Sequence, residues 1–225
     1  MIFDFYDVNN KAMFKALIFD MDGVLIDSEP LHKQIEQDIL KELGVNVSLE
    51  EHFKFASMGK EMWDTMRQRY GFNREATADE LHIEKAKRYL KALTSKPILP
   101  IDGLKELVTY VKEKGLVMAV ASSSGVYNIN LVLKAIGLEE FFSLIVSGEQ
   151  VPRNKPFPDI YLKTAELLQL DVKECAVVED SANGVKSAKA AGMFCIGFRN
   201  LSSGNQDIST ADVIVDSLRE AIGII

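Results

Sequence analysis

The sequence predicts an α/β fold, a doubly wound parallel sheet, with a separate helical unit inserted after the first strand. Short apolar runs bounded by polar residues indicate strands that are buried on both faces. Segments with helical periodicity lie between these runs, and this alternation is typical of a parallel sheet covered by helices. The 225 residues, 47% of them hydrophobic, are enough for one large domain and a smaller one.

Five apolar runs are the expected strands of the sheet. They comprise residues 16–19, 116–121, 144–146, 175–178 and 194–196. One helix is expected around Ile129–Ile136, and another is expected to begin at Pro158-Asp159. Ligands of open parallel sheets bind at the carboxyl ends of the strands, so the polar residues that follow these runs are the candidates for a functional site.

Residues 29–96 are expected to form the helical unit, and residues 1–28 with 97–225 the sheet domain. Three helical patterns occur in the insert, and their apolar residues are Leu31, Ile35 and Ile39, then Trp63, Met66 and Tyr70, then Leu81, Ala86 and Leu90. The insert ends at a linker-like run with two prolines, Pro97 and Pro100. Residues 1–12 are expected to be a poorly ordered extension, because Met13 opens a better first strand than Met1.

Composition narrows the choice of partners and compartment. The net charge of −7 provides no basic field for nucleic acid or an anionic membrane, so neither is an expected partner. Cys175 and Cys195 lie in strand-like runs and are expected to be buried and reduced. Neither a signal peptide nor a transmembrane stretch is found, which indicates a cytoplasmic protein, expected to be a monomer.

The first candidate motif is Asp20-Met21-Asp22-Gly23, which places two carboxylates directly after the first strand. An EF-hand calcium loop would need a third oxygen ligand at the position of Val24, so that alternative fails. Taken alone, the pair could still be two aspartates that follow a strand by chance.

A second acidic pair, Glu179-Asp180, follows the strand at 175–178. Two acidic strand ends that face one crevice repel each other unless a cation lies between them, and oxygen ligands without cysteine or histidine favour Mg²⁺. The three histidines have no zinc-ligand spacing. The alternative is an exposed acidic loop.

Two further strand ends carry groups that could hold a phosphate. Ser122 and Ser123 precede the helix that Gly125 opens, where hydroxyl and backbone N–H groups could bind phosphate oxygens. Lys155 follows the third strand, and nearby prolines restrict its loop. A helix-capping serine turn and a solvated surface lysine are the alternatives.

These sites, taken in order, resemble the haloacid dehalogenase (HAD) superfamily, specifically its sugar-phosphate phosphatases grouped with β-phosphoglucomutase. The four segments that resemble the family motifs are Asp20-Met21-Asp22-Gly23-Val24, Ser122, Lys155 with Pro156 and Asp159, and Val178-Glu179-Asp180-Ser181. The resemblance covers nearly the whole chain. It implies that the insert is the family's mobile helical cap.

The resemblance also implies a mechanism: Mg²⁺-dependent hydrolysis of a small phosphorylated metabolite, such as a sugar phosphate, through an aspartyl phosphate. Asp20 would be the nucleophile and Asp22 the general acid/base. The metal ligands would be Asp20, the backbone carbonyl of Asp22, and Asp180, with Glu179 at or just beyond direct contact. The non-bridging phosphate oxygens would be held by Ser122, Ser123 and Lys155.

A phosphomutase is the main alternative. Such mutases carry an arginine shortly after a cap glycine, whereas here Met62 stands at that position after Gly59. The cap residues expected to meet substrate are His32, Gly59, Lys60, Trp63 and Arg67. A receiver-type signalling domain, which also uses a phosphorylated aspartate, a lysine and Mg²⁺, is disfavoured by the insert and by Asp22.

Overall fold

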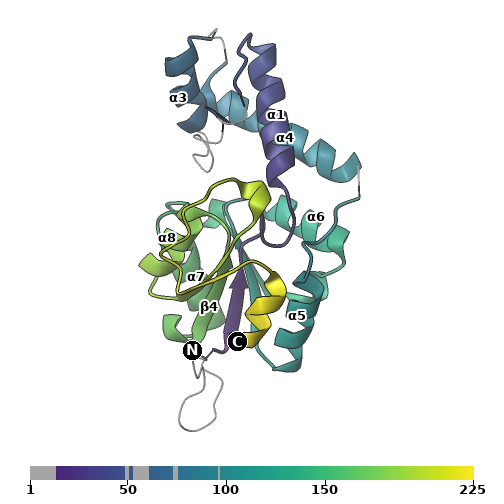
Figure 1. Ribbon diagram of the computed structural model, residues 1–225, viewed down its shortest axis with the longest axis vertical. Coiled ribbons are helices and arrows are strands. Elements are labelled where there is room, and N and C mark those ends of the chain that lie inside the picture. Colours follow the sequence, from purple (N-terminus) through teal and green to yellow (C-terminus); the bar gives the residue numbers. More distant parts are fainter. Residues whose placement is uncertain (1–13, 49–50, 53–60, 73–75, 96) are drawn as a thin grey trace. The chain divides into compact units, whose positions relative to one another are not determined.

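The computed structural model describes residues 14–48, 51–52, 61–72, 76–95 and 97–225 (Figure 1). The expected extension at residues 1–12 lies outside this set. The chain divides into two compact units, which we call the sheet unit (Met1–Asp27 and Ile98–Ile225) and the helical unit (Ser28–Pro97). No described helix combines the length and the apolar character that a membrane-spanning segment needs.

The sheet unit is built on a six-stranded, all-parallel sheet with the strand order β3-β2-β1-β4-β5-β6. Its strands are β1 (Ala16–Phe19), β2 (Val117–Ser122), β3 (Leu144–Ser147), β4 (Cys175–Glu179), β5 (Phe194–Phe198) and β6 (Val213–Val215). The predicted fold class is confirmed. The sixth strand was not expected from the sequence, because only three residues pair there, at the edge of the sheet.

Helices cover both faces of the sheet, which explains the continuous apolar strands. The helices of this unit are α5 (Leu104–Glu113), α6 (Val126–Ile136), α7 (Asp159–Leu168) and α8 (Ala182–Ala190). Ala16 and Ile18 of β1 share a buried cluster with Tyr161 of α7 and Val185 of α8. The alternating residue Leu17 points to the opposite face and is also fully buried.

Short 3-10 helices complete the connections of the sheet unit. They are η1 (Glu139–Phe141), η2 (Gly148–Gln150), η3 (Val172–Glu174), η4 (Leu201–Ser203) and η5 (Leu218–Gly223). Two of them, η2 and η3, begin with a reciprocal capping box. In each, the side chain of Ser147 or Asp171 accepts a hydrogen bond from a backbone N–H of the helix, and the side chain of the third helical residue accepts one from the backbone N–H of Ser147 or Asp171. These caps fix the chain directly after β3 and directly before β4.

The register of the central strands aligns the tips that carry the candidate residues. Phe19 of β1 lies opposite Val120 of β2 and Val178 of β4. Asp20 therefore leaves the sheet at the level of Glu179, and its N–H donates to the Val178 carbonyl at 3.0 Å. The parallel pairing alone brings residues about 160 positions apart to one edge of the sheet.

The helical unit contains α1 (Glu29–Glu42), α3 (Glu61–Tyr70) and α4 (Ala78–Ser95), with no strand among its described residues. Its buried apolar residues include Ile35, Ile39, Trp63, Met66, Leu81, Tyr89 and Leu93. The face expected for the third helix was partly wrong, because Ala86 is exposed and Tyr89 and Leu93 are buried instead.

A buried ionic cluster also holds the helical unit together. Glu36 of α1 pairs with Lys85 of α4 and accepts from His52 Nε2 at 2.8 Å. Burial by itself raises the pKa of Glu36, but Lys85 and His52 outweigh it and lower this pKa to about 2. The cluster therefore links α1 and α4 through an ionised carboxylate.

We expect Ile18→Ala to destabilise the protein by about 2–5 kcal/mol, since it removes fully buried side-chain volume from the central strand. The matched control is Ile214→Ala in the edge strand β6, where the side chain is 36% exposed. This control should cost about 1 kcal/mol or less. Urea unfolding monitored by circular dichroism would measure both, and equal losses would contradict the assignment of β1 as the centre of the core.

Candidate active site

Asp20 is the first residue after β1, and its side chain is buried at the strand tips. Its Oδ1 accepts a hydrogen bond from Lys155 Nζ at 2.6 Å. Gly23 has a φ of 84°, and a Cβ there would lie 1.9 Å from Asp180 Oδ2. A side chain at position 23 would therefore displace the Asp180 carboxylate, which explains why glycine ends this motif.

Lys155 is not the solvated surface lysine that the sequence left open. Its ammonium group donates to Asp20 Oδ1 and Glu179 Oε1, both at 2.6 Å, and to the Ala121 carbonyl at 3.1 Å. Burial by itself lowers the pKa of a lysine, but the carboxylates of Asp20 and Glu179 outweigh it and raise the pKa of Lys155. Lys155 is therefore charged and links the tips of three strands.

Glu179 ends β4 and is fully buried, with hydrogen-bond donors around both carboxylate oxygens. Oε1 accepts from Lys155 and from the Tyr161 hydroxyl at 2.8 Å. Oε2 accepts from the backbone N–H groups of Asp180 (3.1 Å) and Ser181 (3.2 Å) and from the Ser181 hydroxyl (3.1 Å). These donors fix the orientation of the Glu179 carboxylate, which in turn holds the ammonium of Lys155 in place.

Two residues that support Glu179 were not assigned from the sequence. Tyr161 lies in α7 and is fully buried, and burial together with Glu179 raises the pKa of its hydroxyl well above the usual value. It is therefore a neutral donor. Gly184 lies in the first turn of α8, where a Cβ would stand 1.8 Å from the carboxyl carbon of Glu179. The only sequence signal for these roles was the position of both residues just after candidate motifs.

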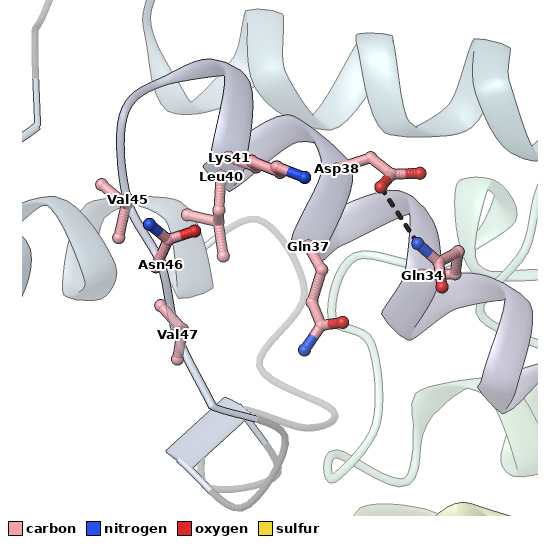
Figure 2. A pocket seen from close by; sticks show the side chains of 8 residues that line it. All are labelled: Gln34, Gln37, Asp38, Leu40, Lys41, Val45, Asn46 and Val47. Carbon is pink, nitrogen blue, oxygen red and sulfur yellow. Dashed lines mark hydrogen bonds between the residues drawn. The ribbon is translucent and has the colours of Figure 1, made fainter.

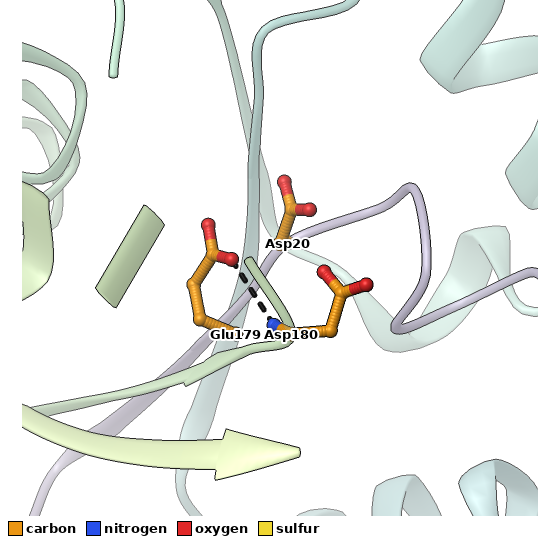
Figure 3. Close-up of side chains that lie close together, drawn as sticks. All are labelled: Asp20, Glu179 and Asp180. Atoms are coloured by element: carbon orange, nitrogen blue, oxygen red, sulfur yellow. Dashed lines mark hydrogen bonds between the residues drawn. The ribbon is translucent and has the colours of Figure 1, made fainter. Parts of the chain in front are cut away.

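A possible metal-binding group is formed by Asp20, Glu179 and Asp180 (Figure 3). Each residue offers a carboxylate oxygen, and these atoms lie within 4.8 Å of one another. Burial raises the pKa of Asp20 to about 8; Lys155 opposes this rise, and Glu179 and Asp22 add to it. The raised pKa shows that the charge of Lys155 alone does not offset the burial of Asp20 and the repulsion by neighbouring carboxylates. An oxygen-only, electron-rich site of this kind fits Mg²⁺.

Asp22 lies two residues beyond Asp20 and has a different partner. Its Oδ2 accepts from the Ser124 hydroxyl at 3.0 Å. Ser124 itself is held in place, because its N–H donates to Ser122 Oγ at 3.1 Å and its carbonyl accepts from the buried Ser147 hydroxyl at 2.7 Å. Sequence reasoning found the serine turn but missed the contact with Asp22, which joins residues 102 positions apart.

The predicted phosphate-binding serines differ in exposure. Ser122 is buried at the end of β2, whereas Ser123 is exposed beside it. The Ser122 hydroxyl accepts one hydrogen bond within the turn, and such a group can still donate its own proton to a ligand. Both residues stand before α6 and share the strand-tip edge with Lys155.

The residues predicted in the helical unit are mostly committed to packing within it. Trp63 is fully buried, and Arg67 donates to the Ala76 carbonyl and to Asp64. The His32 ring stacks on Tyr89 with centroids 4.1 Å apart. Gly59 and Lys60 lie outside the described residues. Substrate contacts by these five residues stay predictions.

The helical unit also carries a surface hollow, at the end of α1 and the segment that follows it (Figure 2). Its lining residues are Gln34, Gln37, Asp38, Leu40, Lys41, Val45, Asn46 and Val47. Gln34 Nε2 donates to Asp38 Oδ1 at 3.0 Å within it. None of the predicted site residues lines this hollow.

A model of the family described as haloacid dehalogenase-like hydrolase matches residues 17–198. The chain belongs to this family. It is 34% identical to Hexitol phosphatase B of Escherichia coli K12 over 211 residues, which cover 91% of this chain and 93% of that protein. It is also 36% identical to the chloroplastic protein SUPPRESSOR OF QUENCHING 1 of Arabidopsis thaliana, over 84% of this chain but only 18% of that longer protein.

Solved structures of the same family share the fold. CbbY from Rhodobacter sphaeroides in complex with xylulose-(1,5)-bisphosphate superposes with a TM-score of 0.82 at 27% identity, covering 92% of this chain and 96% of that one. β-Phosphoglucomutase from Clostridium difficile has a TM-score of 0.77 at 25% identity, covering 92% and 93%. The resemblance inferred from the four motifs is therefore confirmed at the level of the family.

We expect Lys155→Met to reduce the catalytic efficiency by about a hundredfold or more, because it removes a charged donor aimed at the pocket. The protein should stay folded, since Asp20 can then take up a proton. The matched control is Lys163→Met, at a surface lysine of α7 that pairs with Glu166. Steady-state kinetics and circular dichroism would test this, and loss of the fold in Lys155→Met would indicate a structural role instead.

Mg²⁺ affinity should rise with pH up to about 8. Below that pH the metal-free pocket holds a proton on Asp20, which a cation must displace. One displaced proton weakens binding by about tenfold for each pH unit below 8. Titration calorimetry at several pH values, in buffers of different ionisation enthalpy, would report both the affinity and the released proton. A dissociation constant that is flat between pH 6 and 8 would contradict the protonated state of Asp20.

Proposed function

We propose that the protein is a Mg²⁺-dependent phosphatase that hydrolyses a small phosphorylated metabolite, a sugar or polyol phosphate, through phosphorylated Asp20. The observation that carries the proposal is the Asp20 carboxylate, which lies 2.6 Å from the Lys155 ammonium in a buried cluster with two further acids. The names of the relatives, Hexitol phosphatase B and CbbY with its bisphosphate ligand, support this substrate class.

Asp20 would attack phosphorus and form an acyl phosphate while the ester oxygen of the substrate leaves. Asp20, Asp180 and the backbone carbonyl of Asp22 would hold Mg²⁺, which when bound offsets the repulsion between the carboxylate and the phosphate. That repulsion is about 4 kcal/mol for each pair of unit charges about 4 Å apart at an effective dielectric constant near 20. Lys155 would bind a non-bridging oxygen and reduce the same repulsion.

Asp22 would move one proton twice in each turnover. In its protonated form it donates to the departing ester oxygen, so the leaving group departs as an alcohol. The resulting carboxylate then accepts a proton from the water that attacks the acyl phosphate. This second step releases inorganic phosphate and restores both the Asp20 carboxylate and the protonated Asp22. The Ser124 hydroxyl holds Asp22 in position for both transfers.

Residues at the end of β2 and after β3 would orient the phosphate. Ser122 and Ser123, with Lys155, would bind the non-bridging phosphate oxygens.

The helical unit is proposed to act as a cap that excludes water from the reaction. The two buried, free cysteines support a reducing compartment such as the cytoplasm, and a monomer is proposed as the default state.

A phosphomutase is the second candidate, favoured by the similarity to β-phosphoglucomutase. Against it, the position of the expected arginine is taken by Met62, whose side chain is buried. Incubation with β-glucose 1-phosphate and a bisphosphate activator separates the two candidates. Glucose 6-phosphate formed faster than free phosphate would favour the mutase.

The receiver-type alternative is wrong. Receiver domains of the flavodoxin-like class have the strand order 2-1-3-4-5, whereas this sheet has the order 3-2-1-4-5-6. The family match points to a hydrolase as well.

Asp20→Asn should lower phosphate release by more than about a thousandfold, since the amide cannot act as the nucleophile. The test is a panel of hexitol, hexose and pentose phosphates with Mg²⁺, scored by released phosphate. Steady turnover by Asp20→Asn, free of contaminating phosphatase, would refute the proposed mechanism.

Asp22→Asn should lower the rate of phosphate release from these esters by about a hundredfold to ten-thousandfold. The loss should be smaller in the first step with p-nitrophenyl phosphate, whose leaving group needs little acid assistance.

A further inference from the structure

A segment that no motif identified, Asn200–Gln206, lies against the candidate metal ligands. It follows β5 and includes η4. The Asn200 amide donates to the Gly23 carbonyl at 3.0 Å, and the Ser202 hydroxyl donates to Asp27 Oδ2 at 2.7 Å. One side of the segment is thus bonded to the loop that carries Asp20 and Asp22.

The other side of the segment is bonded to the start of α8. The backbone N–H of Ala182 donates to Gln206 Oε1 at 3.1 Å, and Gln206 Nε2 donates to the Ser203 carbonyl at 3.2 Å. Ala182 is only two residues beyond Asp180. The segment therefore links the two acidic motifs, which belong to neighbouring strands but are far apart in the sequence.

Ser203 is the residue of this segment that reaches a predicted metal ligand. Its hydroxyl donates to Asp180 Oδ2, and both side chains are buried. The same oxygen is the atom that a Cβ at position 23 would overlap. The Asp180 carboxylate is thus confined between the Gly23 backbone and the Ser203 hydroxyl, and rotation about its last side-chain bond would break the hydrogen bond.

We propose that Ser203 is a positioning residue that sets the affinity of the site for its divalent cation by fixing the orientation of Asp180. A carboxylate that is already oriented loses less rotational freedom when it binds a cation. Loss of such an outer partner typically weakens metal binding by about 10- to 100-fold. The inference rests on the metal site in the proposed function, but it does not depend on the substrate or on turnover.

The test compares Ser203→Ala with Ser202→Ala as the matched control. Ser202 is the adjacent serine, and its hydroxyl bonds to Asp27 rather than to a predicted metal ligand. Calorimetric titration of metal-free protein with Mg²⁺ should give a dissociation constant about 10- to 100-fold higher for Ser203→Ala and unchanged for Ser202→Ala. Ser203→Thr, which keeps the hydroxyl, should restore binding.

Kinetics provide a second readout. In Ser203→Ala the Mg²⁺ concentration for half-maximal activity should rise in step with the dissociation constant, while kcat at saturating Mg²⁺ stays near wild type. Equal Mg²⁺ affinity in the two alanine variants would overturn the proposal, because the Ser203 hydroxyl would then only fill a buried position. If Ser203→Ala does not fold, Ser203→Cys, a near-isosteric weak donor, replaces it with the same expected loss and the same overturning result.

The outcomes also separate this inference from the proposed function. Wild-type protein that binds Mg²⁺ but releases no phosphate from any ester would refute the phosphatase, and the comparison of Ser203→Ala with Ser202→Ala would still decide the role of Ser203. Wild-type protein that does not bind Mg²⁺ would overturn both.

Discussion

The acidic cluster at the strand tips depends on its contacts with the buried ammonium of Lys155. Carboxylates gathered away from water repel one another and lose their hydration, so they need a compensating charge within contact distance. Lys155 supplies one such charge to Asp20 and Glu179 together. The pKa of Asp20 nevertheless stays near 8, so this single charge does not compensate the whole group. A divalent cation would supply the positive charge that is still missing. The lysine and the cation would therefore balance the negative charge of the carboxylates together.

The rest of the sheet unit can be understood as support for that contact. The parallel register brings Asp20 beside Glu179. The Glu179 carboxylate is then fixed by the Tyr161 hydroxyl of α7 and by its close approach to the backbone of Gly184 in α8. None of these contacts involves a flexible surface side chain. Because Lys155 bonds to an anchored carboxylate, its ammonium is held in place by the protein itself, which is the preorganisation that its proposed electrostatic role requires.

The sequence was sufficient for features that depend on local pattern and insufficient for those that depend on distant pairing. Five strands, their polar ends and the order of the motifs follow from short apolar runs and the residues after them. The edge strand β6 is too short to show an apolar pattern. The buried face of α4 was misassigned because tyrosine occurs on surfaces as well as in cores, so its residue type alone did not identify Tyr89 as buried. Ser124 and Ser203 carry no signal either, since a serine is common and its partner aspartate lies elsewhere in the chain.

The proposed mechanism requires opposite protonation behaviour of Asp20 and Asp22, although only one residue separates them, and their partners explain how one loop would provide both. Asp20 must attack as an anion, and its contact with Lys155 stabilises only the anion. Asp22 must alternate between acid and base, and its contact is a neutral hydroxyl, which can donate to a carboxylate and can also accept from a carboxylic acid. Ser124 can therefore keep Asp22 in place in either state. Distinct neighbours, rather than distinct residue types, would thus separate the proposed nucleophile from the proposed acid/base.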